Sequence, residues 1–246
     1  MIKTVVVLGA TSAIATAVLR QLVGADAYRV ILLGRYAETL NLLRQDLLIR
    51  GAKSVEIVLA DIGDSRCAGA TVQQLLSQVT TIDILLISYG ELGHADARKN
   101  ANETDRLLQV NFTSTAALLS GFLPLFENQR HGHIVVISSV AGDRGRQSNY
   151  IYGAAKGGLT VFLEGLRHYC FRFGVHVLTV KPGFISTPMT AHLPKGVLWS
   201  TPEAIAPLII KAIFSNQSEI YVPGFWRWIM GGVRLLPEWI FHRSRL

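Results

Sequence analysis

The sequence predicts a single α/β domain in which helices cover both faces of a mostly parallel sheet. Short, continuous runs rich in valine, isoleucine and leucine recur along the chain, as expected of strands that are buried on both faces. Helical patterns separate these runs, and such alternation is typical of a doubly wound sheet. No linker rich in proline, glycine or serine divides the 246 residues, so we expect one domain.

Seven apolar runs are predicted as strands, at residues 3–8, 29–33, 55–59, 82–87, 134–137, 175–180 and 220–222. Helices are predicted after the first strand, over residues 38–50 before Gly51, over residues 102–126, and from Asn149 to the stop at Gly174. A further helix starts at Ser200-Thr201-Pro202-Glu203, which offers a cap, a first-turn proline and an acidic residue, and it ends near Phe214.

Composition excludes several classes of protein. Half of the residues are hydrophobic and 17% are charged, which excludes a disordered chain. The apolar runs are too short for a membrane span, and the first one lacks a signal-peptide cleavage pattern. Cys67 and Cys170 lie far apart without a C-x-x-C motif, which predicts a reducing, cytoplasmic setting with neither a disulfide framework nor a metal site. The net charge of +7 suits an anionic partner, but no nucleic-acid-binding motif accompanies it, so nucleic acid is not expected.

The chemistry is predicted to centre on residues 133–156. The strand at 134–137 ends in Ser138-Ser139, at the sheet edge where ligands bind in open α/β proteins. Tyr152 and Lys156 follow on the next helix at i and i+4, so they share one face. A nearby ammonium lowers the pKa of a phenol, so Tyr152 could exchange a proton with a carbonyl or hydroxyl oxygen that Ser139 also hydrogen-bonds.

The alternative is that Tyr152 and Lys156 form an ordinary polar pair on a solvated helix face. The composition of this helix argues against that interpretation, because Gly153, Gly157 and Gly158 each cost a helix up to about 1 kcal/mol relative to alanine. Three such residues around one lysine indicate that another part of the chain presses close to the helix backbone.

Two further motifs indicate a dinucleotide. The first strand runs into the small-residue turn Gly9-Ala10-Thr11-Ser12-Ala13-Ile14-Ala15 and then a helix, an arrangement that presents backbone N–H groups to a pyrophosphate. The second strand ends in Gly34-Arg35, where an NAD site usually has an acidic residue. A basic residue accommodates a 2′-phosphate, so Arg35 favours NADP(H), with NAD(H) less favoured, unless it only caps a solvated loop.

Together these motifs resemble the short-chain dehydrogenase/reductase family, whose hallmark is a serine about a dozen residues before Y-x-x-x-K. The first turn is similar to the family's T-G-x-x-x-G-I-G, with Gly9 and Ile14 matching and alanine at 13 and 15 in place of glycine. The resemblance implies a Rossmann-type sheet of about seven strands in the order 3-2-1-4-5-6-7. It also implies an NADP(H)-dependent enzyme that reduces a carbonyl to a hydroxyl.

The resemblance further implies roles for individual residues. Tyr152 would protonate the carbonyl oxygen, Ser139 would polarise it, Lys156 would tune Tyr152 and hold the nicotinamide ribose, and Asn111 would maintain a proton relay through a water. Without the resemblance, Asn111 fits a satisfied core amide. The implied cofactor residues are Gly9, Thr11, Ser12, Ala13, Ile14, Arg35, Asp61, Ile62, Gly90, Tyr152, Lys156, Pro182, Gly183, Ile185 and Thr187. The sequence departs from the family at Ser88-Tyr89-Gly90, where N-A-G is usual, and Tyr89 is a bulky residue without an explanation.

A narrower resemblance concerns the substrate. Residues 139–150 and the C-terminal F-W-R-W-I-M are similar to the decaprenylphosphoryl-2-keto-pentose reductases, which act on a keto sugar carried on polyprenyl phosphate. This resemblance implies a lipid-linked carbonyl substrate, with Arg144 and Arg146 as candidate ligands of its phosphate. The alternatives are a reductase of soluble acyl-carrier or small carbonyl substrates and a non-catalytic module that senses NADP(H).

The domain is predicted to span residues 1–224, with a mobile substrate lid near 190–199, and residues 225–246 form an amphipathic tail. Pro237 should kink the tail or start a second helix. The tail either lies at the inner face of the membrane, with its tryptophans at headgroup depth, or packs against the domain or a second subunit. The glycine- and alanine-rich helix face also predicts a homo-oligomer, a dimer or a tetramer.

Overall fold

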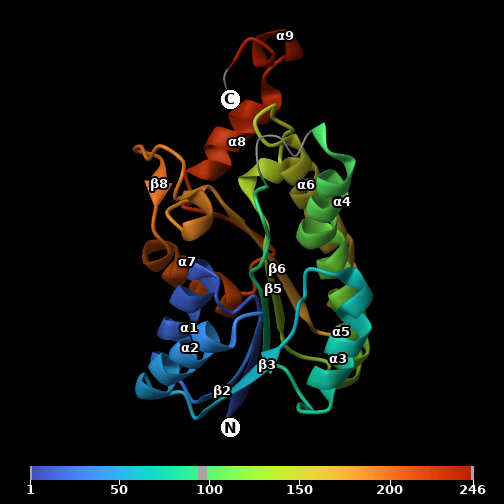
Figure 1. Cartoon of the computed structure of the whole chain (residues 1–246), viewed down its shortest axis with the longest axis vertical. Coiled ribbons are helices and arrows are strands. Elements are labelled where there is room, and N and C mark those ends of the chain that lie inside the picture. The colour runs from blue at the N-terminus through green and yellow to red at the C-terminus, as the bar shows by residue number, and fades with distance from the viewer. Residues whose placement is uncertain (1, 94–98, 245–246) are drawn as a thin grey trace.

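The computed structural model describes residues 2–93 and 99–244 and shows a twisted sheet between two layers of helices (Figure 1). Within these residues the main sheet has seven parallel strands in the order β3-β2-β1-β4-β5-β6-β9, which confirms the predicted topology. The strands are β1 (Lys3–Leu8), β2 (Tyr28–Gly34), β3 (Ser54–Leu59), β4 (Ile84–Ile87), β5 (His133–Ile137), β6 (His176–Pro182) and β9 (Glu219–Val222).

Alternate residues of each central strand enter different cores, which explains why these strands are apolar throughout. Val5 and Val7 of β1 face one core with α1 (Ala13–Ala25), α2 (Ala37–Ile49) and α7 (Pro202–Phe214). Val6 and Leu8 face the other with α3 (Ala68–Leu76), α5 (Ser114–Gln129) and α6 (Tyr150–Phe171). Figure 1 shows these two sets of helices on opposite sides of the sheet. A parallel sheet with both faces covered needs such continuous apolar strands.

The long helix predicted at residues 102–126 is interrupted. The chain forms α4 (Ala101–Leu108), then a π-helical segment at Gln109–Thr113, then α5. Asn111 lies inside the π-helical segment and is fully buried. Single π-helical turns within α-helices occur frequently at functional sites, so this irregularity marks Asn111 independently of any motif.

Residues 184–200 form a small unit beside the end of β6. β7 (Phe184–Ile185) pairs in parallel with β8 (Trp199–Ser200), and a 3₁₀ turn at Pro188–Thr190 lies between them. Most of the predicted lid, residues 190–199, therefore lies between a short helical turn and a strand that ties its far end to the domain.

The C-terminal tail forms α8 (Trp226–Leu235) and α9 (Glu238–Phe241), and Pro237 immediately precedes α9. Trp226 and Met230 are buried against the domain, whereas Trp228 and Trp239 are 81% and 64% exposed. The tail thus combines a packed face with an exposed apolar one. Its last two residues, 245 and 246, lie outside the described residues. No described helix is both long and apolar enough to cross a membrane.

Candidate active site

A cleft of about 520 Å³ opens at the carboxyl edge of the main sheet. Its lining contains Ser139, Arg146 and all fifteen of the cofactor residues predicted from the sequence, while Asn111 and Arg144 lie outside the lining. These residues come from segments far apart in the chain, and they meet because parallel strands place all their carboxyl ends along one edge. The predicted cofactor residues therefore share one cleft, and their individual roles remain predictions.

The turn after β1 fits a phosphate group. Gly9 has a positive φ of +78°, and an added Cβ would lie 2.7 Å from the Cβ of Tyr89, so only glycine fits there. Ser12 precedes α1 without a side-chain cap, which leaves the first backbone N–H groups of the helix open toward the cleft. The Ser12 hydroxyl is instead 2.9 Å from that of Ser88. An anion at this helix N-terminus would take up the open N–H groups.

The part of the cleft predicted to hold adenosine is formed after β2 and β3. Arg35 follows β2, is exposed, and lies over the ring of Tyr36 at 5.5 Å; no described carboxylate pairs with it. Asp61 accepts a hydrogen bond from the backbone N–H of Gly63 at 3.0 Å, and Ile62 beside it is buried. An unpaired guanidinium at this position fits a nucleotide with an additional phosphate.

Tyr89, which the sequence left unexplained, has a structural role. Its hydroxyl lies 2.9 Å from Ser114 Oγ and accepts a hydrogen bond from Thr115 at 3.0 Å, and burial raises the pKa of Tyr89 to about 12. The phenol therefore stays protonated and joins the end of β4 to α5. Its Cβ is also the group that restricts Gly9.

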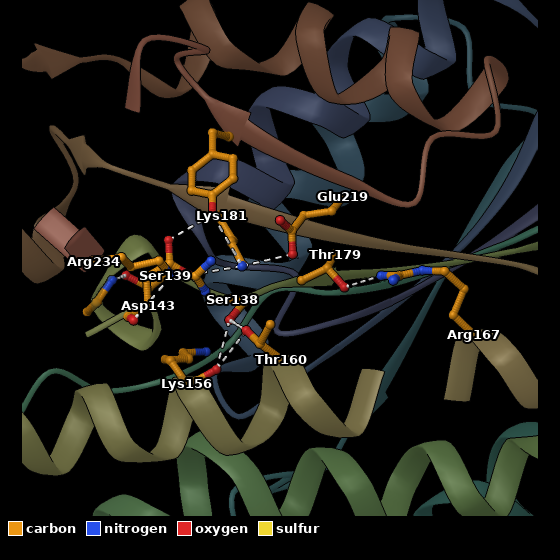
Figure 2. A network of polar contacts seen from close by, with 12 residues as sticks. Ser138, Ser139, Asp143, Lys156, Thr160, Arg167, Thr179, Lys181, Glu219 and Arg234 are labelled. Carbon is orange, nitrogen blue, oxygen red and sulfur yellow. Dashed lines mark hydrogen bonds and ion pairs between the residues drawn. The ribbon is translucent and has the colours of Figure 1, made fainter. Parts of the chain in front are cut away.

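The two serines after β5 have different surroundings (Figure 2). Ser138 is buried, and its hydroxyl donates to the carbonyl of Lys156 at 3.2 Å and pairs with Thr160 Oγ1 at 3.0 Å. Ser139 lines the cleft, accepts from the backbone N–H of Ala141 at 3.1 Å, and is hydrogen-bonded to Tyr152. Ser138 therefore fixes α6 against the sheet, and Ser139 is the hydroxyl available to a ligand.

Tyr152 and Lys156 lie together at the cleft, with the lysine Nζ 5.8 Å from the centre of the phenol ring. Lys156 is buried and donates to the carbonyl of Ile137 at 3.1 Å, and burial lowers its pKa to about 8. Burial raises the pKa of Tyr152, and this outweighs the hydrogen bond from Ser139, which lowers it. The prediction that Lys156 lowers the pKa of Tyr152 is therefore wrong, because desolvation of the buried phenol has the largest effect on that pKa.

The glycines of α6 accommodate the turn that carries Ser139. A Cβ on Gly153 would lie 2.9 Å from the carbonyl oxygen of Ala141, and one on Gly157 would lie 3.0 Å from that of Gly142. The body that presses on the helix is thus the 3₁₀ turn at Val140–Gly142. These contacts are internal to the chain, so the two glycines give no separate support for packing between subunits.

Asn111 is held by backbone groups on both sides of its amide. Its Oδ1 accepts from the N–H of Glu91 at 3.0 Å, and its Nδ2 donates to the carbonyls of Glu91 and Leu107 at 2.8 and 2.9 Å. A Cβ on Gly90 would lie 2.6 Å from Asn111 Oδ1 and 3.4 Å from Lys156 Nζ, so the three residues meet. The side chain is therefore a buried amide whose hydrogen bonds are satisfied within the chain, and the water-mediated relay to Lys156 remains a prediction.

The tail contributes to the cleft through Gly183, a contact that the sequence did not reveal. A Cβ on Gly183 would lie 1.9 Å from Trp226 Nε1, so the indole rests directly on the backbone of the segment after β6. Phe184 packs edge-on against Trp226 at 5.1 Å and stacks on Trp199 at 5.4 Å. These aromatic contacts join α8, the segment beside the predicted nicotinamide position, and the end of the predicted lid.

An ionic cluster behind the cleft was also missed (Figure 2). Lys181 Nζ lies 2.9 Å from Asp143 Oδ1 and 2.8 Å from Glu219 Oε2, and both the lysine and Asp143 side chains are almost fully buried. Tyr221 donates to the same aspartate at 2.8 Å, and Arg234 of α8 reaches it at 3.3 Å. A lysine at the end of an otherwise apolar strand was the available signal, because such a charge needs a buried partner.

The two arginines of the loop before α6 have different environments. Arg144 donates to the carbonyls of Val233 and Leu236 at the end of α8 and lies 3.9 Å from the centre of the Phe241 ring. Its guanidinium satisfies the last carbonyls of that helix, and this partner takes the place of the substrate phosphate that the sequence predicted for Arg144. Arg146 does line the cleft.

Comparison with known proteins agrees with this geometry. Residues 3–197 match the family model for short chain dehydrogenases. The chain is 34% identical over 247 residues to an uncharacterized oxidoreductase of Streptomyces coelicolor, covering 98% of this chain and 95% of that protein. It is 30% identical over 240 residues to an uncharacterized oxidoreductase of Mycobacterium tuberculosis, covering 97% and 96%.

Among solved structures, a variant of actinorhodin polyketide ketoreductase with NADPH superposes with a TM-score of 0.79 at 21% identity, covering 91% of this chain and 96% of that one. This likeness concerns the fold. The family model matches most of the chain, and the two relatives match it over nearly their whole length. The chain therefore belongs to the short-chain dehydrogenase/reductase family of oxidoreductases.

Proposed function

We propose that the protein is an NADP(H)-dependent reductase that converts a carbonyl to a hydroxyl. The observation that carries this proposal is that Ser139, Tyr152 and Lys156 converge at one cleft, beside a helix N-terminus suited to phosphate. When bound, the nicotinamide would supply hydride to the carbonyl carbon. The residues of the chain would then have to orient the carbonyl and supply a proton to its oxygen.

Tyr152 fits the role of proton donor. Because burial raises its pKa, the phenol is protonated at neutral pH and can donate to the oxygen as negative charge develops there. The single O–H of Ser139, which is directed to Tyr152 here, can turn to the same oxygen and donate a second hydrogen bond to it. Lys156, with a pKa of about 8, is still mostly protonated at neutral pH, and with its Nζ 5.8 Å from the centre of the phenol ring it could return a proton to the tyrosine through a bridging group.

The preference for NADP(H) rests on Arg35. The residue lies at the end of β2, lines the cleft, and has no described acidic partner, so a 2′-phosphate could pair with it. The fold is also similar to that of the ketoreductase solved with NADPH. NADPH should bind more tightly than NADH, and Arg35→Ala should narrow the difference by about 1 to 3 kcal/mol, the range for hydrogen bonds to charged groups. Equal affinity of the wild type for the two nucleotides would contradict this assignment.

The catalytic part is tested by NADPH oxidation with a panel of lipid-linked and soluble ketones. Tyr152→Phe should abolish turnover, because it removes the proton donor, while NADPH titration should remain nearly unchanged. Substantial reductase activity in this variant would rule out the assignment. A wild type that binds NADPH but reduces no ketone would instead favour a non-catalytic sensing module.

A lipid-linked keto sugar is the substrate that we propose, with the protein at the inner face of the cytoplasmic membrane. The exposed side of α8 and α9 supports this, because Trp228, Leu235 and Trp239 are exposed and three arginines accompany a single acidic residue over positions 225–244. Tryptophans next to basic residues are typical of helices that lie in the headgroup region. Trp226 and Met230 are excluded from this role because they are buried against the domain.

Co-sedimentation with vesicles of phosphatidylglycerol and phosphatidylcholine tests the membrane proposal. Trp228→Ala combined with Trp239→Ala should weaken binding by roughly tenfold or more, whereas Ile49→Ala, an equally exposed apolar position at the end of α2, should not. Equal binding of both variants and the wild type would leave the exposed face without a lipid partner. Reduction of soluble ketones alone would then favour the reductase of small or acyl-carrier substrates.

We also propose a homo-oligomer, a dimer or a tetramer. Val161 and Phe171 of α6 are 68% and 83% exposed on the helix that also carries the catalytic pair, and exposed apolar side chains such as these could contact a second copy of the chain. Light scattering of the purified protein should give a mass of two or four chains, and Phe171→Glu should shift it toward one.

A further inference from the structure

Arg146, like Arg35, lines the cleft without a described carboxylate partner, but Arg35 is exposed whereas Arg146 is partly buried. Its Nε atom is buried and makes no hydrogen bond, and no carboxylate within residues 2–93 and 99–244 pairs with it. Arg144, two residues earlier in the same loop, satisfies the end of α8 instead. The same short loop therefore contains one arginine with a structural partner and one without.

An unpaired, partly buried guanidinium is costly. Arginine does not lose its proton under ordinary conditions, so the charge itself must be satisfied by an anion or by water. Burial lowers the pKa of Arg146, which shows that its surroundings disfavour the charged form. Such an arrangement persists most readily where a ligand supplies the missing negative charge.

A second orphaned group lies on the same wall of the cleft. Asn149 immediately precedes α6 but makes no side-chain cap, and its Oδ1 is buried without a hydrogen-bond partner although the residue lines the cleft. An amide oxygen accepts hydrogen bonds, so it requires a hydroxyl or N–H from outside the chain. Arg146 is therefore a hydrogen-bond donor without an anion, and Asn149, three residues later, is an acceptor without a donor. Both lie shortly before Tyr152 in the chain.

Arg146 also lines a second cavity, of about 350 Å³, between the loop and α9. This cavity lies beside the rings of Tyr150 and Phe241 and reaches His242. Since the arginine lines both spaces, a group bound to it could be attached to the reacting carbonyl on one side and to a further substituent on the other. A phosphodiester has both connections, and a phosphate monoester has only the one to the carbonyl-bearing part.

We propose that Arg146, with Asn149, forms an anion-binding subsite that holds a phosphate group of a hydroxylated carbonyl substrate. The proposal rests on the carbonyl-reductase function proposed above and specifies its substrate class. The guanidinium pairs with the phosphate, the amide accepts from a hydroxyl of the same molecule, and the carbonyl then extends toward Ser139 and Tyr152. The phosphate belongs either to a soluble sugar phosphate or to a lipid-linked sugar.

Three carbonyl probes test the subsite in the full-length protein with saturating NADPH: ribulose, ribulose 5-phosphate, and a ketopentose joined through phosphate to farnesol. Arg146→Gln should raise KM for the phosphorylated probes by about 10- to 100-fold, as expected for a lost hydrogen bond to a charged group, and change KM for ribulose less than about twofold. Arg146→Lys should recover part of the loss. The phosphorylated probe with the higher kcat/KM identifies the soluble or the lipid source.

A binding readout separates this proposal from the proposed activity. Inorganic pyrophosphate should raise the Tm of the NADPH-bound wild type, because the nucleotide already fills the turn after β1, and Arg146→Gln should lose that rise. If ribulose is reduced but Arg146→Gln alters KM equally for all three probes, or for none, the subsite is refuted while the reductase function stands. If no probe is reduced but the rise in Tm with pyrophosphate still requires Arg146, the subsite stands and the proposed activity needs revision. If no probe is reduced and pyrophosphate raises the Tm of neither protein, or of both equally, the subsite is refuted.

Discussion

Replacing Asp143 with asparagine should lower the free energy of unfolding by about 3 kcal/mol. The substitution keeps the shape of the side chain but removes the charge that faces Lys181, and the two side chains are 1% and 2% exposed. Loss of one partner from a buried ion pair costs about 3 to 5 kcal/mol. Glu219 remains 2.8 Å from the lysine and is 29% exposed, so the lower end of that range is expected.

Urea unfolding followed by tryptophan fluorescence measures this effect, provided that the m-value is unchanged. Arg234→Gln is the matched control, because that side chain touches the same aspartate at 3.3 Å but is 54% exposed, and its loss should cost at most about 1 kcal/mol. The double variant Asp143→Asn/Lys181→Met should cost less than the sum of the single changes. If Asp143→Asn were as mild as the control, the cluster would contribute little to the fold.

Three other predictions concern the site. Ser139→Ala should lower kcat by about 100-fold or more, whereas Ser138→Ala should mainly lower stability by about 1 kcal/mol; equal kinetic effects would contradict their separate roles. Reductase activity should fall as the pH rises through about 8, the pKa of Lys156, and a flat rate profile would argue against a protonated lysine. The contribution of Lys156 to the free energy of unfolding should increase as the pH rises from about 8 to 10.5, because over that range the unfolded chain still binds the proton that the folded chain has lost. Gly183→Ala should destabilise the protein by about 1 to 3 kcal/mol because its methyl meets the indole packed on it, and Gly224→Ala, with open space around its added methyl, should not; equal unfolding curves would refute the contact.

The sheet and the cleft could be predicted because they depend on local patterns. The strand at 134–137 is apolar throughout because both faces are covered, and Tyr152 and Lys156 share a helix face because of their spacing. Gly153 and Gly157 predicted that another part of the chain packs closely on the helix, and the structure identifies that part as the turn at Val140–Gly142.

The features that could not be predicted depend on residues distant in the chain. Lys181 meets Asp143 across 38 positions, and Gly183 meets Trp226 across 43, so neither contact leaves a periodic signal. The expected effect of Lys156 on Tyr152 had the wrong sign because spacing shows proximity but not burial, and burial decides the direction of the pKa here.

The π-helical segment makes the position of Asn111 depend on chain length as well as on side-chain identity. A π-helical turn contains one residue more than an α-helical turn, so removing one residue from Gln109–Thr113 could restore regular hydrogen bonding while leaving α4 and α5 close to their present register and changing the direction of the Asn111 side chain. Substitution scanning would not detect this constraint, whereas single-residue deletions should. A deletion in this segment should therefore yield a folded protein whose asparagine no longer reaches Glu91, separating helix formation from placement of the amide.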